Sequence, residues 1–147
     1  KWLNGGCYDS LRNRVVLGFS NDLNTGGYLT AISTDFETVI LNSEVEVNTH
    51  LNSLAYDPIN DVIYTPNNGV VGGVYVIAPT TLAVVRNFTI PGVDSVIRSI
   101  AYDETNHIYY VSYSNHVPLL GITVDVKVIF PVLSFTLSKY TPGLLTS

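Results

Sequence analysis

The sequence predicts an all-β protein built from three copies of one four-stranded unit. Short runs rich in β-branched and aromatic residues alternate with breaks that contain Asp, Asn, Pro or Gly, as strands alternate with turns. Tyr-Asp pairs recur at 8–9, 56–57 and 102–103, with spacings of 56 − 8 = 48 and 102 − 56 = 46 residues. A repeat in the forties with four strands per unit is typical of a β-propeller blade.

The repeat continues along each unit. When the Tyr-Asp pairs are aligned, a small residue precedes each pair, a strand follows it, and a glycine precedes the third strand. The aligned positions are Cys7, Ala55 and Ala101, then 15–17, 63–65 and 109–111, and then Gly27, Gly73 and Gly121. We therefore expect a partial propeller of three antiparallel, four-stranded blades at about 2–50, 50–95 and 96–140. They form one domain, 1–147, with a tail at 141–147, and the strand carrying the small residue is innermost.

Each unit shows the same order of strands and turns. In the first, the turn 9–13 joins two strands, the loop 21–27 precedes a third, and the fourth strand, 38–47, alternates Glu44 and Glu46 with valines. That alternation is typical of an outer strand with one wet face. The second unit has runs within 53–67, at 73–78 and at 82–90, and closes at Pro91-Gly92. The third repeats the pattern over 97–140, and no helix of normal length is expected.

Composition narrows the class of protein. Charged residues make up only 13% of the chain, against about 25% in ordinary globular domains. This suits a β-rich surface or secreted protein better than a cytosolic enzyme. The seven Lys and Arg residues are scattered and the net charge is −5, which excludes a basic patch for nucleic acid. No apolar run approaches the roughly 18 residues of a membrane span. The single cysteine, Cys7, excludes an internal disulfide.

The repeat resembles the YVTN-type propellers of archaeal and bacterial surface proteins over nearly the whole chain. Their repeat runs Tyr-Val-Thr-Asn, then Val-x-Val-Ile-Asp, then a Thr-rich turn and a Val-Val-x-x-Ile-x-Val-Gly ending. The second unit offers Ile63-Tyr-Thr-Pro-Asn67, Val74-Tyr-Val-Ile-Ala78, Thr80-Thr81, and 84–92, while the third offers Tyr110-Val-Ser112. Ala78 stands where the family has Asp, so a turn contact by that carboxylate is missing. The resemblance implies fold more specifically than function.

Together, composition and resemblance favour a non-catalytic interaction or structural module, extracellular or on the cell surface, whose partner is a protein or a glycan there. One alternative is a segment of a larger propeller enzyme, an oxidoreductase or hydrolase, with its catalytic residues outside this chain. Another is the head domain of a virus or appendage. The sequence offers no catalytic motif, no metal-ligand spacing among its three histidines and no cofactor motif, so we expect no catalytic residues, metal or cofactor.

Two sets of repeated polar positions are candidate site residues. Asp9, Asp57 and Asp103 invite a calcium or catalytic interpretation, but each begins a tight turn, where an Asp side chain accepts backbone N–H groups. A structural turn role is therefore favoured. The second set begins the innermost strands and comprises Asn4, Asn52 and Arg98. Side chains there can face a central channel and a ligand, although a structural polar contact is the favoured interpretation.

The only Asn-x-Ser/Thr sequon is Asn87-Phe88-Thr89, on the expected outermost strand of the second blade. Asn87 is therefore a candidate glycosylation site if the protein is secreted in a glycosylating host.

Three blades are too few to close a propeller into a ring. Propellers close with about four to eight blades, which removes exposed edges and faces. Either the chain is a fragment of a larger propeller, or two or more chains assemble into a ring, or the blades pack in an open arrangement. The sequence begins at Lys1 and contains no Met, which favours the fragment. In every case we expect further blades or self-association to cover the ends.

Overall fold

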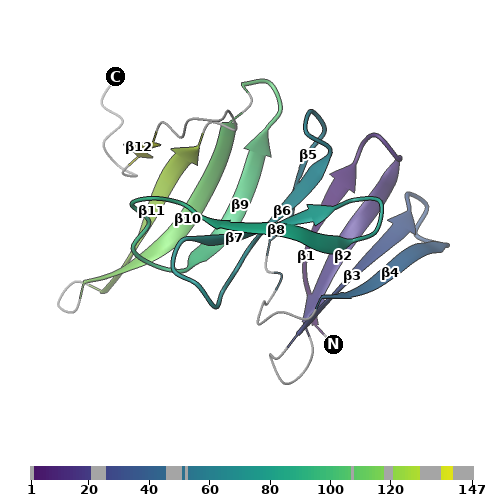
Figure 1. Ribbon diagram of the computed structural model, residues 1–147, viewed down its shortest axis with the longest axis horizontal. Helices are drawn as coiled ribbons and strands as arrows, with labels where there is room; N and C mark the ends of the chain where they lie inside the picture. Colours follow the sequence, from purple (N-terminus) through teal and green to yellow (C-terminus); the bar gives the residue numbers. More distant parts are fainter. Residues whose placement is uncertain are drawn as a thin grey trace.

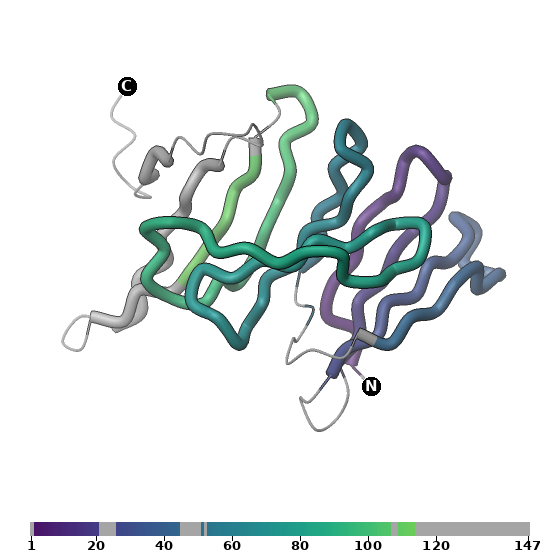
Figure 2. The backbone as a smooth tube through the Cα atoms, viewed as in Figure 1, coloured from purple at the N-terminus to yellow at the C-terminus, as the bar shows by residue number. Residues whose placement is uncertain are grey.

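The computed structural model describes the backbone at 2–20, 26–45, 51, 53–106, 108–117, 121–129 and 137–140. It describes the side chains at 2–20, 26–44, 51, 53–106 and 109–113, and the remaining parts of the tube are grey (Figure 2). Asn52 and the expected tail at 141–147 lie outside these residues. Within the described ranges, no helix is long and apolar enough to cross a membrane.

The chain folds into three antiparallel sheets of four strands, each in up-and-down order. The first blade holds β1 (Trp2–Asp9), β2 (Arg14–Ser20), β3 (Gly27–Ser33) and β4 (Val39–Val45). The second holds β5 (Ala55–Asp57), β6 (Val62–Pro66), β7 (Gly73–Ala78) and β8 (Ala83–Thr89). The third holds β9 (Ile97–Asp103), β10 (Ile108–Val117), β11 (Gly121–Ile129) and β12 (Leu137–Tyr140). The predicted fold class, all-β with three four-stranded blades, is confirmed.

The blades lie side by side in chain order, with the second between the first and the third (Figure 1). The first strands of neighbouring blades lie against one another: β1 contacts β5, and β5 contacts β9. Cys7, Ala55 and Ala101 lie on these three strands. Small side chains suit this position, because the first strands of neighbouring blades are in contact there.

One row of side chains recurs across the three blades. It begins with the tyrosine of each Tyr-Asp pair and continues through directly paired residues of the neighbouring strands, which share one face of the sheet. The rows are Tyr8, Val15, Ile32 and Val39; Tyr56, Ile63, Ile77 and Val84; and, among the third-blade side chains that the structure describes, Tyr102 and Tyr109. We call each of these a tyrosine row. In the second and third blades, it faces the preceding blade.

The tyrosine rows correct the glycine-based alignment of the third strands. Aligning Gly27 with Gly73 implies an offset of 73 − 27 = 46, whereas the pairing of Ile32 with Val15 and of Ile77 with Ile63 gives 77 − 32 = 45. A one-residue slip moves every side chain of a strand to the opposite face of its sheet. The apolar face, and not the glycine before the strand, therefore sets the register.

The hydrophobic core consists of two clusters, one at each junction between blades. The first joins buried residues of the first two blades and the segment between them: Val16, Leu29, Ala31, Leu51, Leu54, Tyr56, Ile63, Ile77 and Leu82. The second joins the second and third blades and their linker: Ala55, Val74, Ile90, Val93, Ile97, Ile100, Tyr109, Val111 and Tyr113. Apolar burial is therefore provided by contacts between neighbouring repeats, as in other repeat proteins.

We predict that Ile63→Ala destabilises the protein by about 2–5 kcal/mol, because it leaves a cavity at the first junction, where Ile63 is fully buried. Ile59→Ala is the matched control, since Ile59 is 59% exposed on the neighbouring turn and is expected to change stability by less than about 0.5 kcal/mol. Chemical denaturation measures both. Equal losses for the two variants would contradict the placement of the core at the junction.

Candidate functional site

The three repeated aspartates lie at the turn between the first two strands of each blade. Asp57 Oδ1 accepts the backbone N–H groups of Ile59 at 2.9 Å and Asn60 at 3.2 Å, and its Oδ2 accepts Asn60 Nδ2 at 2.6 Å. Asp103 makes the same three contacts with Thr105 and Asn106, at 3.0, 3.1 and 2.8 Å. These carboxylates hold the turns as Asx motifs do.

The first blade replaces the turn asparagine with Arg12. Its backbone N–H donates to Asp9 at 3.2 Å, and its guanidinium lies 3.2 Å from the same carboxylate. The guanidinium also spans the junction to Asp61 of the second blade, with bonds of 2.8 and 2.6 Å, and Asp61 accepts the Tyr56 hydroxyl at 2.9 Å. Arg12 thereby lowers the pKa of the Asp61 carboxyl, and its bond to Asp61 raises its own pKa.

A buried ion pair lies beside this bridge. Arg14 Nε donates to Asp9 Oδ2 at 2.9 Å, and both side chains are almost completely buried. The far end of the Arg14 guanidinium donates to the backbone carbonyl of Pro79 in the turn between β7 and β8. Asp9 is therefore both the turn residue of its own blade and the partner of a cation that contacts the next blade.

The second junction also contains a turn carboxylate. Asp57 is completely buried and accepts the hydroxyl of Tyr109 from the third blade. Burial, with a further contribution from the bond to Asp57, raises the pKa of Tyr109. The neighbouring Tyr102 has its pKa raised to about 12 by burial and by the nearby Asp57 charge. The rings of Tyr64 and Tyr109 meet edge to face, with centroids 4.7 Å apart.

This geometry assigns Asp9 and Asp57 to turns and blade junctions, where their oxygens are already bonded. In the ranges whose side chains the structure describes, no three His, Cys, Asp or Glu residues come together as metal ligands would. The Cys7 thiol is half-buried on β1, and its pKa is raised to about 12 by burial and by Asp9, with Arg14 opposing the shift. A thiol with this pKa is a poor nucleophile at neutral pH.

The candidate channel positions differ from one another in their surroundings. Asn4 is half-buried on β1 and donates to the Ser20 hydroxyl of its own blade at 2.8 Å. Arg98 is exposed on β9, and Asn52 lies outside the described residues. A ligand role for the three positions stays a prediction.

Asn87 is exposed on β8, the outermost strand of the second blade, where it pairs with Tyr75 of β7. An enzyme that modifies the amide could approach it there. Its glycosylation stays a prediction.

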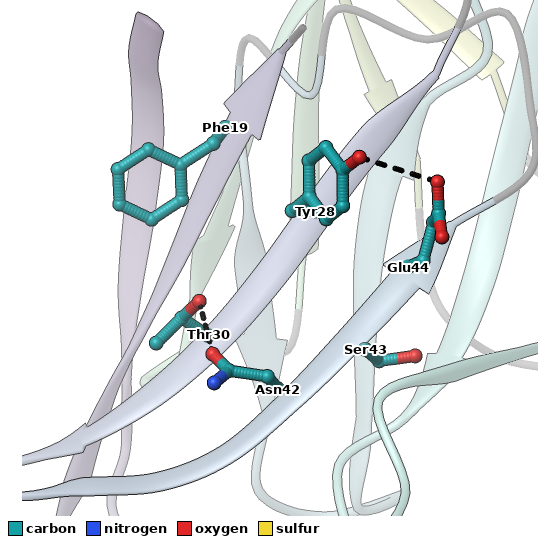
Figure 3. A pocket seen from close by; sticks show the side chains of 6 residues that line it. All are labelled: Phe19, Tyr28, Thr30, Asn42, Ser43 and Glu44. Carbon is teal, nitrogen blue, oxygen red and sulfur yellow. Dashed lines mark hydrogen bonds between the residues drawn. The ribbon is translucent and has the colours of Figure 1, made fainter. Parts of the chain in front are cut away.

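A shallow groove of about 480 Å³ crosses the first blade, and sequence reasoning missed it. It is lined by Phe19, Tyr28, Thr30, Asn42, Ser43 and Glu44 from β2, β3 and β4 (Figure 3). The Tyr28 hydroxyl donates to Glu44 at 3.2 Å, and the Thr30 hydroxyl donates to Asn42 at 2.7 Å. The alternation of Tyr28 and Thr30 along β3 is the signal that could have placed both side chains on one face.

The groove adjoins the first tyrosine row, against which no blade packs within the part of the chain that the structure describes. Tyr8 is 51% exposed, whereas Tyr56, at the same position of the second blade, is 7% exposed. Val39 is 58% exposed at the other end of the row. We call this surface the head face and define it by Leu3, Tyr8, Val15, Ile32, Val39 and the groove. It is the candidate functional site, because the large apolar side chains of Leu3, Tyr8 and Val39 are exposed on it, while Ile32 is 9% exposed.

Similar folds occur among solved structures at low sequence identity. The WD40 repeats of RRP9 match with a TM-score of 0.63 at 10% identity, over 95% of this chain and 38% of that one. Hydrazine synthase of Kuenenia stuttgartiensis matches with a TM-score of 0.61 at 16% identity, over 88% of this chain and 32% of that one. The WD40 β-propeller domain of Doa1 matches with a TM-score of 0.54 at 11% identity, over 86% of this chain and 36% of that one. The chain therefore has a propeller-repeat fold and spans about a third of the length of these proteins.

No family model matches the sequence, and no curated protein matches it either. The structural likeness shows the fold alone, since one propeller architecture supports unrelated activities.

We predict that Tyr109→Phe lowers the free energy of unfolding by about 1.5–3 kcal/mol, because it removes a hydrogen-bond donor from the buried Asp57 carboxylate. Tyr110→Phe removes the same hydroxyl from the next residue, which is 38% exposed, and is expected to cost less than about 0.5 kcal/mol. Denaturant titration of both variants gives the difference. If they lose the same stability, the Tyr109–Asp57 bond does not support the junction.

We further predict that Cys7 resists thiol reagents in the folded protein. Its pKa of about 12 lies above the ordinary value of 9.0, so the reactive thiolate is scarcer at pH 8–9 than in the unfolded chain. The labelling rate with a disulfide reagent, measured with and without denaturant, reports on this residue alone, because the chain has one cysteine. Folded-state labelling at the rate of a free thiol would disprove the prediction.

Proposed function

We propose that this chain is a non-catalytic interaction or structural module of an extracellular or cell-surface protein, and that it binds its partner through the head face. The carrying observation is the exposure of Tyr8 and Val39, whose counterparts in the second blade are covered by a neighbouring sheet. Exposed apolar patches of this kind mark contact surfaces. A protein suits such a face better than a glycan, since a second sheet surface can cover the whole row.

The proposed location is supported by composition and by the repeat. A propeller with 13% charged residues has the character of a surface protein more than that of a cytosolic one. The resemblance of Ile63-Tyr-Thr-Pro-Asn67 and Val74-Tyr-Val-Ile-Ala78 to YVTN-type repeats points to the same compartment. The exposed sequon at Asn87 is compatible with secretion in a glycosylating host.

A site-directed cross-link tests the proposal. A photoreactive amino acid replaces Val39 in cells that produce the protein, and a membrane-impermeant biotin reagent labels the intact cells before irradiation. We expect biotinylated protein that cross-links to a defined partner from position 39. Val85 is the matched control, because it is a valine of β8 with 59% exposure, against 58% for Val39.

One result would overturn the proposed location, and another would overturn the proposed contact surface. Biotin labelling only after cell lysis would exclude the surface location. Absence of a cross-link from position 39, or equal cross-linking from positions 39 and 85, would show that the head face is not the contact surface.

A further inference from the structure

Every junction in this chain is made from two different halves. The following blade contributes its tyrosine row. The preceding blade contributes the opposite face, on which the small residue of the first strand pairs with a residue of the second strand. These pairs are Cys7 and Val16, Ala55 and Tyr64, and Ala101 and Tyr110. In the third blade, we call this side the tail face and define it by Ala101, Tyr110 and the turn at 103–106.

The tail face is exposed at Ala101 and Tyr110, as the head face is at Tyr8 and Val39. Ala55 and Val16 are buried at the two junctions, whereas Ala101 is exposed and Tyr110 is 38% exposed. The turn carboxylates show the same contrast: Asp9 and Asp57 are completely buried, while Asp103 is partly exposed. The chain therefore carries both halves of one more junction, one half at each end.

The polar groups at the turns indicate which blade fits the head face. At the first junction, Arg12 meets the carboxylate of Asp61, but the corresponding residue of the first blade is the neutral Asn13, which accepts the Tyr8 hydroxyl at 2.7 Å. A covering blade like the first would bring an arginine to a position without a carboxylate. The third blade carries Asn106 in place of Arg12, and Asn106 is exposed. The tail face therefore matches the head face in polarity as well as in apolar character.

We propose that the occupant of the head face is the tail face of a second copy of this chain, and that the head face of the second copy receives the tail face of the first. This inference rests on the proposed role of the head face as a contact surface. Two identical head-to-tail contacts related by a two-fold axis join three blades to three blades, which gives six, within the range of about four to eight at which propellers close. The pairing covers the exposed side chains of the head face and of the tail face at once.

The test is the mass of the 147-residue chain in solution, by light scattering and sedimentation across a dilution series. We expect a species of twice the chain mass. Val39→Lys places a charge in the head contact and weakens dimerisation by on the order of 100-fold or more. Tyr110→Lys does the same from the tail, with Ala101→Lys as a second tail variant. Val85→Lys, at an equally exposed valine outside both faces, leaves the dimer intact.

Mixing the two single variants identifies the contact as head to tail. Val39→Lys keeps an intact tail and Tyr110→Lys keeps an intact head, so an equimolar mixture is expected to form dimers through one undamaged contact, although neither variant does so alone. Circular dichroism confirms that each variant is folded. A mixture that stays monomeric overturns the head-to-tail assignment.

The remaining outcomes also decide the matter. A wild-type chain that is monomeric at all concentrations overturns the second copy as occupant, and a ladder of higher oligomers overturns the closed ring. A monomeric chain together with a cross-link from position 39 in cells would refute this inference alone, because the head face would then have a different occupant. If the chain is dimeric in solution but position 39 gives no cross-link in cells, the result would instead count against the proposed function.

Discussion

A four-stranded sheet cannot bury either of its faces by itself, and the structure depends on this constraint more than on any other. Both hydrophobic clusters lie between sheets, and the residues that line them come from adjacent repeats. Stability is therefore a property of junctions. Ile63 and Tyr109 belong to the same row of their respective blades, and each is buried because a preceding blade lies against it. The same row in the first blade is chemically similar, but its two ends, Tyr8 and Val39, are exposed.

The turn aspartates show how one residue serves local and long-range structure together. Asp57 bonds its own turn through Ile59 and Asn60 and also accepts Tyr109 from the next blade. A buried carboxylate without these donors would carry a large desolvation cost, so the hairpin and the junction support each other. Asp9 is linked to the next blade through Arg14 instead. In the second blade, the position of Tyr109 is occupied by Ile63, which has no hydrogen-bond donor in its side chain.

Much of the architecture can be predicted from local signals, whereas the contacts between blades cannot. Strand order and the turn positions follow from alternating apolar runs and from the repeated Asp, which are features of a few consecutive residues. The third-strand register does not follow from the glycine, because register depends on which face is apolar. Arg12 and Asp61 are 49 residues apart, and Tyr109 and Asp57 are 52 apart, so no short pattern connects them. The groove is likewise formed by neighbours across three strands.

The charge difference between Asn13 and Asp61 has a consequence for how the chain reaches its folded state. Repeats with similar apolar faces compete for one another during folding, and wrong pairings between them are a known route to misassembly. Asp61 of the second blade offers Arg12 a carboxylate across the junction, whereas the equivalent position of the first blade carries the amide of Asn13. The ion pair between Arg12 and Asp61 thus favours the pairing of the first blade with the second over a pairing with another copy of the first. It contributes to fidelity through discrimination between partners, even where its contribution to stability is small.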